Sequence, residues 1–292
     1  MLKGMMPVLL SPMHEDGSPD HDGYVKLLDY LYEEPLPGLW ALGSAGEAFN
    51  MSYGHRVEVA EVVAEHMAGR TCLLMGAGSM VLPNIYRFFE ETAHLPITGY
   101  HVMPIDRKLN TKAIIDYYTD LSERSPRPLW LYSNPARMLQ FPFEAIKEIA
   151  QHPNIAGMKV GGYNMALASK LATLHSEQFE VLGAGGSNLL GYLAYGIECV
   201  TMSTGSCFPK GYTAVIDLWL QGKIKEAQAQ AFRMNKLIGA LGPWKNTEDP
   251  AELKVVLELF GICQRWTYPP FKPCTGGEAA GIKKVLIENG YL

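Results

Sequence analysis

Cysteine is scarce in this sequence and is never paired in a metal-binding pattern. The five cysteines form no CxxC pair and leave an odd one, which indicates neither a zinc ribbon nor a disulfide framework. None of the eight histidines stands at the spacing that metal ligands use. We therefore expect no metal site, and free thiols in a reducing compartment.

Charge of one sign and long apolar runs are missing as well. The net charge is −5 and no Lys/Arg cluster stands out, which argues against a nucleic acid or an acidic membrane surface as a partner. No apolar run approaches the roughly 18 residues that a membrane span requires. The first apolar segment is interrupted by Pro7 and Pro12 and lacks an A-x-A-like cleavage site. We interpret it as a strand and expect a cytoplasmic protein.

Short apolar runs alternate along the chain with longer amphipathic ones. With 48% hydrophobic and 19% charged residues, the chain can bury a large core. Helical patterns lie between the runs, and the one over 52–69 opens with Ser52 and stops at Gly69. The runs are apolar enough for strands that are covered on both faces, and they span 6–12, 38–44, 71–78, 97–104, 128–134, 155–161, 179–185 and 199–205.

Eight strands, each followed by a helix, predict an α/β fold of the TIM (β/α)8 barrel type. Active-site groups are then expected at the C-terminal ends of the strands. A doubly wound open sheet is the alternative, which the number of units disfavours. After about residue 220 the pattern turns entirely helical, so we expect a barrel over 1–220 and a C-terminal helical extension over 221–292 that packs on it.

Lys159 is the most unusual residue of the predicted strands. It stands in the apolar segment "NIAGMKVGG" (154–162), which holds no acidic residue, although lysine is rarely buried unless it is paired. At the mouth of a barrel it would lose hydration, and its pKa would fall. The neutral amine could then attack a ketone and form a Schiff base. The alternative is a lysine that extends its ammonium to solvent or pairs with a distant carboxylate.

A turn rich in small residues follows the second predicted strand. Its sequence is Gly43-Ser44-Ala45-Gly46-Glu47. Two glycines let the backbone present N–H groups to an anion such as a carboxylate, and Ser44 adds a hydroxyl. Glu47 would tie down the turn or pair with a neighbouring group. The alternative is an ordinary strand-to-helix turn with a surface glutamate.

Tyr132 ends the fifth predicted strand, and Arg137 lies on the loop after it. A phenol that projects over the barrel mouth beside Lys159 could move protons to and from a substrate. The arginine offers a planar, two-pronged grip for a carboxylate. The alternatives are a core tyrosine bonded to the backbone and a solvated arginine.

Together these residues resemble the dihydrodipicolinate synthase / N-acetylneuraminate lyase family, which comprises class I, Schiff-base, pyruvate-handling aldolases on a TIM barrel. The resemblance extends over essentially the whole chain. Residues 43–47 are similar to the family's G-[ST]-T-G-E turn, and 132–137 to its Y-N-x-P turn with a following arginine. Residues 157–159 are similar to its G-[IM]-K strand.

The resemblance implies a mechanism. Lys159 would form an iminium with pyruvate or another 2-oxo acid, and Tyr132 would act as the acid/base beside it. Ser44 and the N–H of Ala45 would bind the carboxylate, and Ser44 would also relay a proton to Tyr132. Gly183 falls near the family's glycine whose carbonyl contacts the substrate.

The resemblance also implies further partners. Gly46 and Glu47, in the same turn as Ser44 and Ala45, would also bind the substrate. The second substrate would be an aldehyde, and neither a cofactor nor a metal is needed because the iminium withdraws the electrons. The chain would form a homodimer or a homotetramer.

The sequence departs from the family at three places. Ala45 replaces a usual threonine, and "VGG" (160–162) follows the lysine where E-A-[TS] is more usual. Asp106 stands where a relay tyrosine is expected, with Ile105 before it, and a carboxylate near Tyr132 would raise its pKa.

The exact reaction therefore stays open. Arg137 favours a dihydrodipicolinate synthase, in which it would help to hold the carboxylate of aspartate semialdehyde. Ala45 and Asp106 favour an enzyme for another 2-oxo acid, such as a 2-keto-3-deoxy sugar-acid aldolase or dehydratase, or an N-acetylneuraminate lyase-like enzyme.

Two alternatives of other classes remain. The first is a non-catalytic protein that binds or senses a 2-oxo acid, which the substitution at Asp106 would explain. The second takes "GAGGS" (183–187) as a phosphate cradle, but no basic residue flanks that loop.

Overall fold

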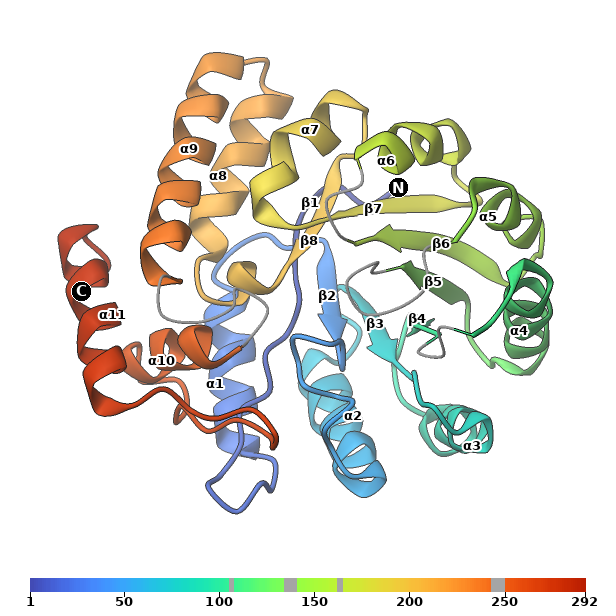
Figure 1. Cartoon of the computed structure of the whole chain (residues 1–292), viewed down its shortest axis with the longest axis horizontal. Helices are drawn as coiled ribbons and strands as arrows, with labels where there is room; N and C mark the ends of the chain where they lie inside the picture. Colours follow the sequence, from blue (N-terminus) through green and yellow to red (C-terminus); the bar gives the residue numbers. More distant parts are fainter. Residues whose placement is uncertain (105–107, 134–140, 162–164, 243–249) are drawn as a thin grey trace.

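Eight parallel strands form one sheet that curls into a nearly closed barrel (Figure 1). The computed structural model describes residues 1–104, 108–133, 141–161, 165–242 and 250–292. The order β1-β8-β7-β6-β5-β4-β3-β2 leaves β1 and β2 at the two ends, and a parallel bridge between Val8 and Trp40 joins them. The predicted (β/α)8 barrel is therefore confirmed, and the open doubly wound sheet is wrong. The strands are β1 (Gly4–Pro7), β2 (Gly38–Ala41), β3 (Cys72–Gly76), β4 (Gly99–Val102), β5 (Leu129–Ser133), β6 (Ile155–Val160), β7 (Glu180–Ala184) and β8 (Cys199–Met202).

An α-helix follows each strand and covers the outside of the barrel (Figure 1). The predicted helix at 52–69 is α2, in which the Ser52 side chain accepts a hydrogen bond from the His55 N–H. Its last turn closes at Ala68, which adopts a left-handed conformation with φ of 47°. The helices are α1 (His21–Leu31), α2 (Tyr53–Met67), α3 (Leu82–Thr92), α4 (Thr111–Arg124), α5 (Phe143–Ile149), α6 (Met165–Leu171), α7 (Leu189–Ala194) and α8 (Pro209–Leu220).

The observed strands are shorter than the predicted ones. The first was predicted over 6–12, but β1 ends at Pro7. Leu9 and Leu10 are nevertheless buried. The chain continues beside β2, where Val8 forms the bridge to Trp40 and the Leu9 N–H donates to the Trp40 carbonyl. An apolar run therefore reports burial and can extend past the last residue of a strand.

The barrel interior is filled in layers. The layer nearer the beginnings of the strands contains Gly99, Trp130 and Gly157. A Cβ on Gly157 would come within 2.4 Å of the Trp130 ring. Glycine is required there because the indole occupies the space. Side chains alternate along a strand, so the residues two positions later face the same interior one level higher. On β5 and β6 these residues are Tyr132 and Lys159.

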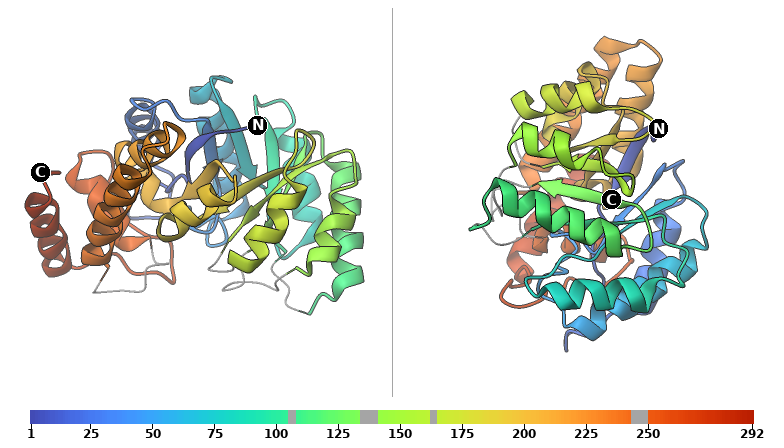
Figure 2. Two further views of the ribbon diagram at one scale, coloured as in Figure 1. Left: turned by 90° about the horizontal axis from the view of Figure 1, so that it is seen from above. Right: turned by 90° about the vertical axis from the view of Figure 1, so that its right-hand side faces the viewer.

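The C-terminal part packs against α1 and α8 on one side of the barrel (Figures 1 and 2). It contains α9 (Ile224–Leu241), α10 (Ala251–Leu259) and α11 (Gly276–Glu288). Phe260 lies 6.0 Å from Tyr30 of α1, and Phe208 lies 4.9 Å from Tyr291, between ring centroids. The prediction of an entirely helical extension was too simple, because 260–275 forms no helix. The division at residue 220 stays a prediction. In the described ranges, no helix has the length and apolar character needed to cross a membrane.

Candidate active site

Lys159 lies inside the barrel among aromatic rings. Its partner in the register of β5 and β6 is Tyr132. The Nζ atom lies 4.6 Å from the ring centroid of Trp40 and 4.6 Å from that of Tyr132. The residue is 5% exposed, and no carboxylate of the described residues pairs with it. Lys159 therefore does not extend its ammonium into solvent, and it forms no ion pair with an acidic residue in the described part of the chain.

Burial lowers the pKa of Lys159 below its usual value. The charge and hydrogen bonding of Tyr132 oppose this shift without cancelling it. A lowered pKa increases the fraction of neutral amine near pH 7, which is the nucleophilic form. The site therefore favours attack by Nζ on an electrophilic carbon.

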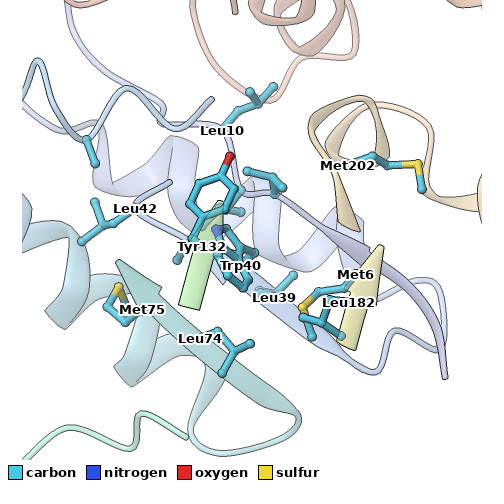
Figure 3. Packing of buried hydrophobic residues seen from close by; sticks show 14 of the residues in the cluster. Met6, Leu10, Leu39, Trp40, Leu42, Leu74, Met75, Tyr132, Leu182 and Met202 are labelled. Atoms are coloured by element: carbon cyan, nitrogen blue, oxygen red, sulfur yellow. The ribbon is translucent and has the colours of Figure 1, made fainter. Parts of the chain in front are cut away.

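Tyr132 and Ser44 place two hydroxyls near this amine. The Ser44 Oγ and Tyr132 Oη atoms are 3.4 Å apart. The Tyr132 ring meets Trp40 edge-on at 5.5 Å, and Figure 3 shows its hydroxyl pointing toward Leu10, in the segment after β1. The two hydroxyls can exchange a proton after a small approach.

The turn over 43–47 has the form expected of an anion site. Ser44 and Ala45 are partly exposed, whereas Gly46 is buried. Within the described chain the N–H groups of these three residues donate no hydrogen bond. The Gly46 carbonyl accepts a bond of 2.6 Å from the Ser11 hydroxyl, and a Cβ at Gly46 would lie 2.8 Å from the Leu9 carbonyl oxygen. Glycine is thus required for the close approach, and the free N–H groups are available to a carboxylate.

Glu47 turns away from the turn into a buried ion pair. Its Oε2 lies 2.9 Å from Nζ of Lys254 on α10, and both side chains are fully buried. Its Oε1 accepts a hydrogen bond of 2.7 Å from the Tyr268 N–H. Lys254 also donates to the carbonyls of Ser11 and Trp266. The carboxylate is enclosed by these partners, so Glu47 pairs with a neighbouring group as the turn sequence suggested, and its predicted contact with substrate stays a prediction.

His101 and Trp40 are site neighbours that the sequence analysis missed. Their rings stack at 3.9 Å and 18°. The His101 Nε2 lies 2.8 Å from the Ala41 carbonyl, which fixes Nε2 as the donor. Burial lowers the pKa of His101 to about 3, and the positive charge of Lys159 acts in the same direction. The imidazole is therefore neutral at physiological pH.

The roles of the three remaining predicted residues stay predictions. Gly183 lies in β7, where its carbonyl accepts a bond of 3.1 Å from the Thr201 hydroxyl. A Cβ there would lie 2.6 Å from the Tyr192 ring, so packing alone requires the glycine. Asp106 and Arg137 lie outside the described residues, and their roles stay predictions.

The chain is similar to known proteins along its whole length. The model of the dihydrodipicolinate synthetase family matches residues 1–288. The 4-hydroxy-tetrahydrodipicolinate synthase of Neisseria meningitidis serogroup C is 27% identical over 296 residues, which cover 100% of both chains. The dihydrodipicolinate synthase structure from Bacteroides thetaiotaomicron superposes with a TM-score of 0.92 at 21% identity, covering 98% of each chain.

One solved relative carries a ligand. It is the prophage protein YagE of E. coli K12, described as a member of the dihydrodipicolinic acid synthase family in complex with pyruvate. Its TM-score is 0.90 at 21% identity, covering 99% of each chain. At this identity the likeness establishes the shared barrel fold.

Proposed function

Because this chain belongs to the dihydrodipicolinate synthetase family, we propose that it is a Schiff-base lyase that joins or splits a 2-oxo acid and an aldehyde through Lys159. One observation carries the proposal: a lysine that is 5% exposed lies beside Tyr132 without a carboxylate partner in the described residues. A structural lysine in such a place would leave its charge uncompensated. A catalytic amine requires this environment.

The first step forms the iminium. Nζ attacks the ketone carbon of pyruvate, and the carbonyl oxygen takes one proton from the nitrogen and one from Tyr132. It then leaves as water, and the nitrogen keeps one proton and the positive charge. Tyr132, now a phenolate, accepts a proton from the methyl carbon and yields the enamine. Ser44 lies 3.4 Å from the phenol and supports this proton transfer.

The enamine carbon then attacks the aldehyde, whose oxygen takes a proton from Tyr132. Hydrolysis of the resulting iminium frees Lys159. The hydroxyl of Ser44 and the free N–H of Ala45 hold the carboxylate of the 2-oxo acid. Lys159 and Tyr132 thus act on the reacting atoms, and Ser44 and Ala45 hold the carboxylate.

The full-length relative named 4-hydroxy-tetrahydrodipicolinate synthase supports aspartate semialdehyde as the aldehyde. Ala45, which carries no hydroxyl, supports a second candidate, the cleavage of a 2-keto-3-deoxy sugar acid. We further propose a cytoplasmic homodimer or homotetramer, and light scattering after gel filtration measures that assembly state. A monomer would contradict this part.

Turnover separates these activities. The purified chain is incubated with pyruvate and aspartate semialdehyde, or with a 2-keto-3-deoxy sugar acid alone, and pyruvate is measured. We expect consumption in the first mixture, none with Lys159→Ala, and no change with Lys170→Ala, an exposed lysine of α6. Release of pyruvate in the second mixture would select the sugar-acid reaction. Thermal stabilisation by pyruvate without any turnover would identify a binding protein instead.

A further inference from the structure

Nζ of Lys159 carries a positive charge in two forms: the ammonium, which is in equilibrium with the neutral amine that attacks, and the iminium of the proposed mechanism. Buried charges are normally compensated by an ion of opposite sign. Among the residues that the structure describes, no acidic side chain performs this role at Lys159. Within that part of the chain, stabilising the charge falls to groups that carry no negative charge.

Trp40 presents the face of its indole to this charge. Nζ lies 4.6 Å from the ring centroid, which is within the range of a cation–π interaction, and tryptophan is the strongest partner in such contacts. Trp40 is 0% exposed, so water does not compete for the cation. The Tyr132 ring lies at the same distance, but its hydroxyl is committed to proton transfer.

His101 holds the indole in place without adding charge. It stacks on Trp40 and donates its Nε2 proton to the Ala41 carbonyl of the same strand as Trp40. An imidazolium in this position would repel Lys159 and compete for the electrons of the indole. A neutral ring instead leaves the indole free to interact with the lysine.

We propose that the indole of Trp40, held by neutral His101, stabilises the positive charge of Lys159, first as the ammonium and then as the iminium of the bound 2-oxo acid. The inference rests on the proposed function and deepens it. By favouring the protonated C=N bond, the ring keeps the intermediate in the form that withdraws electrons from the neighbouring carbon. Trp40 thus acts through Lys159 as a positioning residue.

Among the described residues, few titratable groups face Lys159. Tyr132 faces it from β5 and His101 from β4, while Arg56 of α2 acts on His101. On the other side, its partner in the register of β7 is Leu182, which does not titrate. A change in the pH dependence of Lys159 can therefore be assigned to the ring contact once these groups are kept.

Fluorinated tryptophan tests the contact with little change of shape. Each added fluorine withdraws electrons from the ring face and weakens its attraction for a cation. The protein is produced with mono-, di- and trifluorotryptophan, and the rate of pyruvate adduct formation at Lys159 is measured against pH by cyanoborohydride trapping and peptide mapping. We expect the apparent pKa of Lys159 to fall stepwise, by about one unit in total. The amine is then about tenfold more abundant at neutral pH.

Two variants assign the effect to one ring. In Trp40→Phe the stepwise trend should vanish, whereas in Trp130→Phe, which removes the indole one layer lower, it should persist. An unchanged apparent pKa across the fluorinated wild-type series would overturn the inference, as would a trend that survives in Trp40→Phe. If Trp40→Phe does not fold, the Trp130→Phe series decides the matter: a trend that persists there supports Trp40, whose ring lies under Nζ, and a trend that vanishes overturns the inference. Absence of any adduct in unlabelled protein would instead overturn the proposed function itself.

Discussion

Replacing Lys254 by methionine should destabilise the protein strongly and disturb a site to which Lys254 contributes no reacting atom. Lys254 and Glu47 are both fully buried and lie 2.9 Å apart. Removing the cation leaves the carboxylate of Glu47 buried with the Tyr268 N–H at its Oε1. Breaking a buried pair in this way costs about 3–5 kcal/mol. The loss should appear in urea unfolding at pH 7.

The same variant should weaken pyruvate binding, because Glu47 ends the turn that carries Ser44 and Ala45. The double variant Glu47→Gln/Lys254→Met removes both charges and should recover most of the lost stability. Lys284→Met is the matched control, since Lys284 is 77% exposed and pairs loosely with Glu288 at 3.8 Å. Its cost should stay below about 0.5 kcal/mol. If Lys254→Met costs no more than this control, the assigned role of the buried pair is wrong.

Four further variants probe the amine and its neighbours. Lys159→Met should abolish the pyruvate adduct. It should also raise the free energy of unfolding at pH 7, because the unfolded chain protonates the Lys159 amine more readily than the folded chain does. In urea unfolding this gain should shrink as pH rises toward 10.5. His101→Gln should have a lower free energy of unfolding than wild type at pH 7. Below pH 6.5 this difference should shrink by about 1.4 kcal/mol per pH unit, because the unfolded wild type protonates its His101 in that range and the folded wild type does not. A difference that stays constant with pH would contradict the neutral imidazole. Tyr132→Phe should lower kcat about 10²–10⁴-fold while still allowing slow adduct formation. Ser44→Ala should lower kcat less and raise KM for pyruvate. If the two variants changed kcat and KM by equal factors, the separate roles of Tyr132 in proton transfer and Ser44 in carboxylate binding would be wrong.

The barrel and the central group of the site could be predicted because both depend on local patterns. Apolar runs with helices between them specify the strands, and a parallel barrel brings all their C-terminal ends to one rim. Lys159, Tyr132 and Ser44 were therefore predicted to lie close together, and the structure places them so.

The supporting residues could not be predicted, because their partners lie far away in the sequence. Lys254 looks like one basic residue of an amphipathic helix until α10 packs against the barrel and brings it to Glu47. His101 and Trp40 look like ordinary strand residues until β2 and β4 place their rings in contact. The ends of the strands were also missed, since Leu9 and Leu10 are buried although β1 ends at Pro7.

The most direct test of the account is borohydride reduction of the protein in the presence of pyruvate, followed by intact mass and peptide mapping. The account predicts one reduced pyruvate unit per chain, attached to Lys159, and none in Lys159→Ala. An adduct at another lysine, or no adduct with pyruvate or any longer 2-oxo acid, would contradict the claim that Lys159 is the Schiff-base nucleophile.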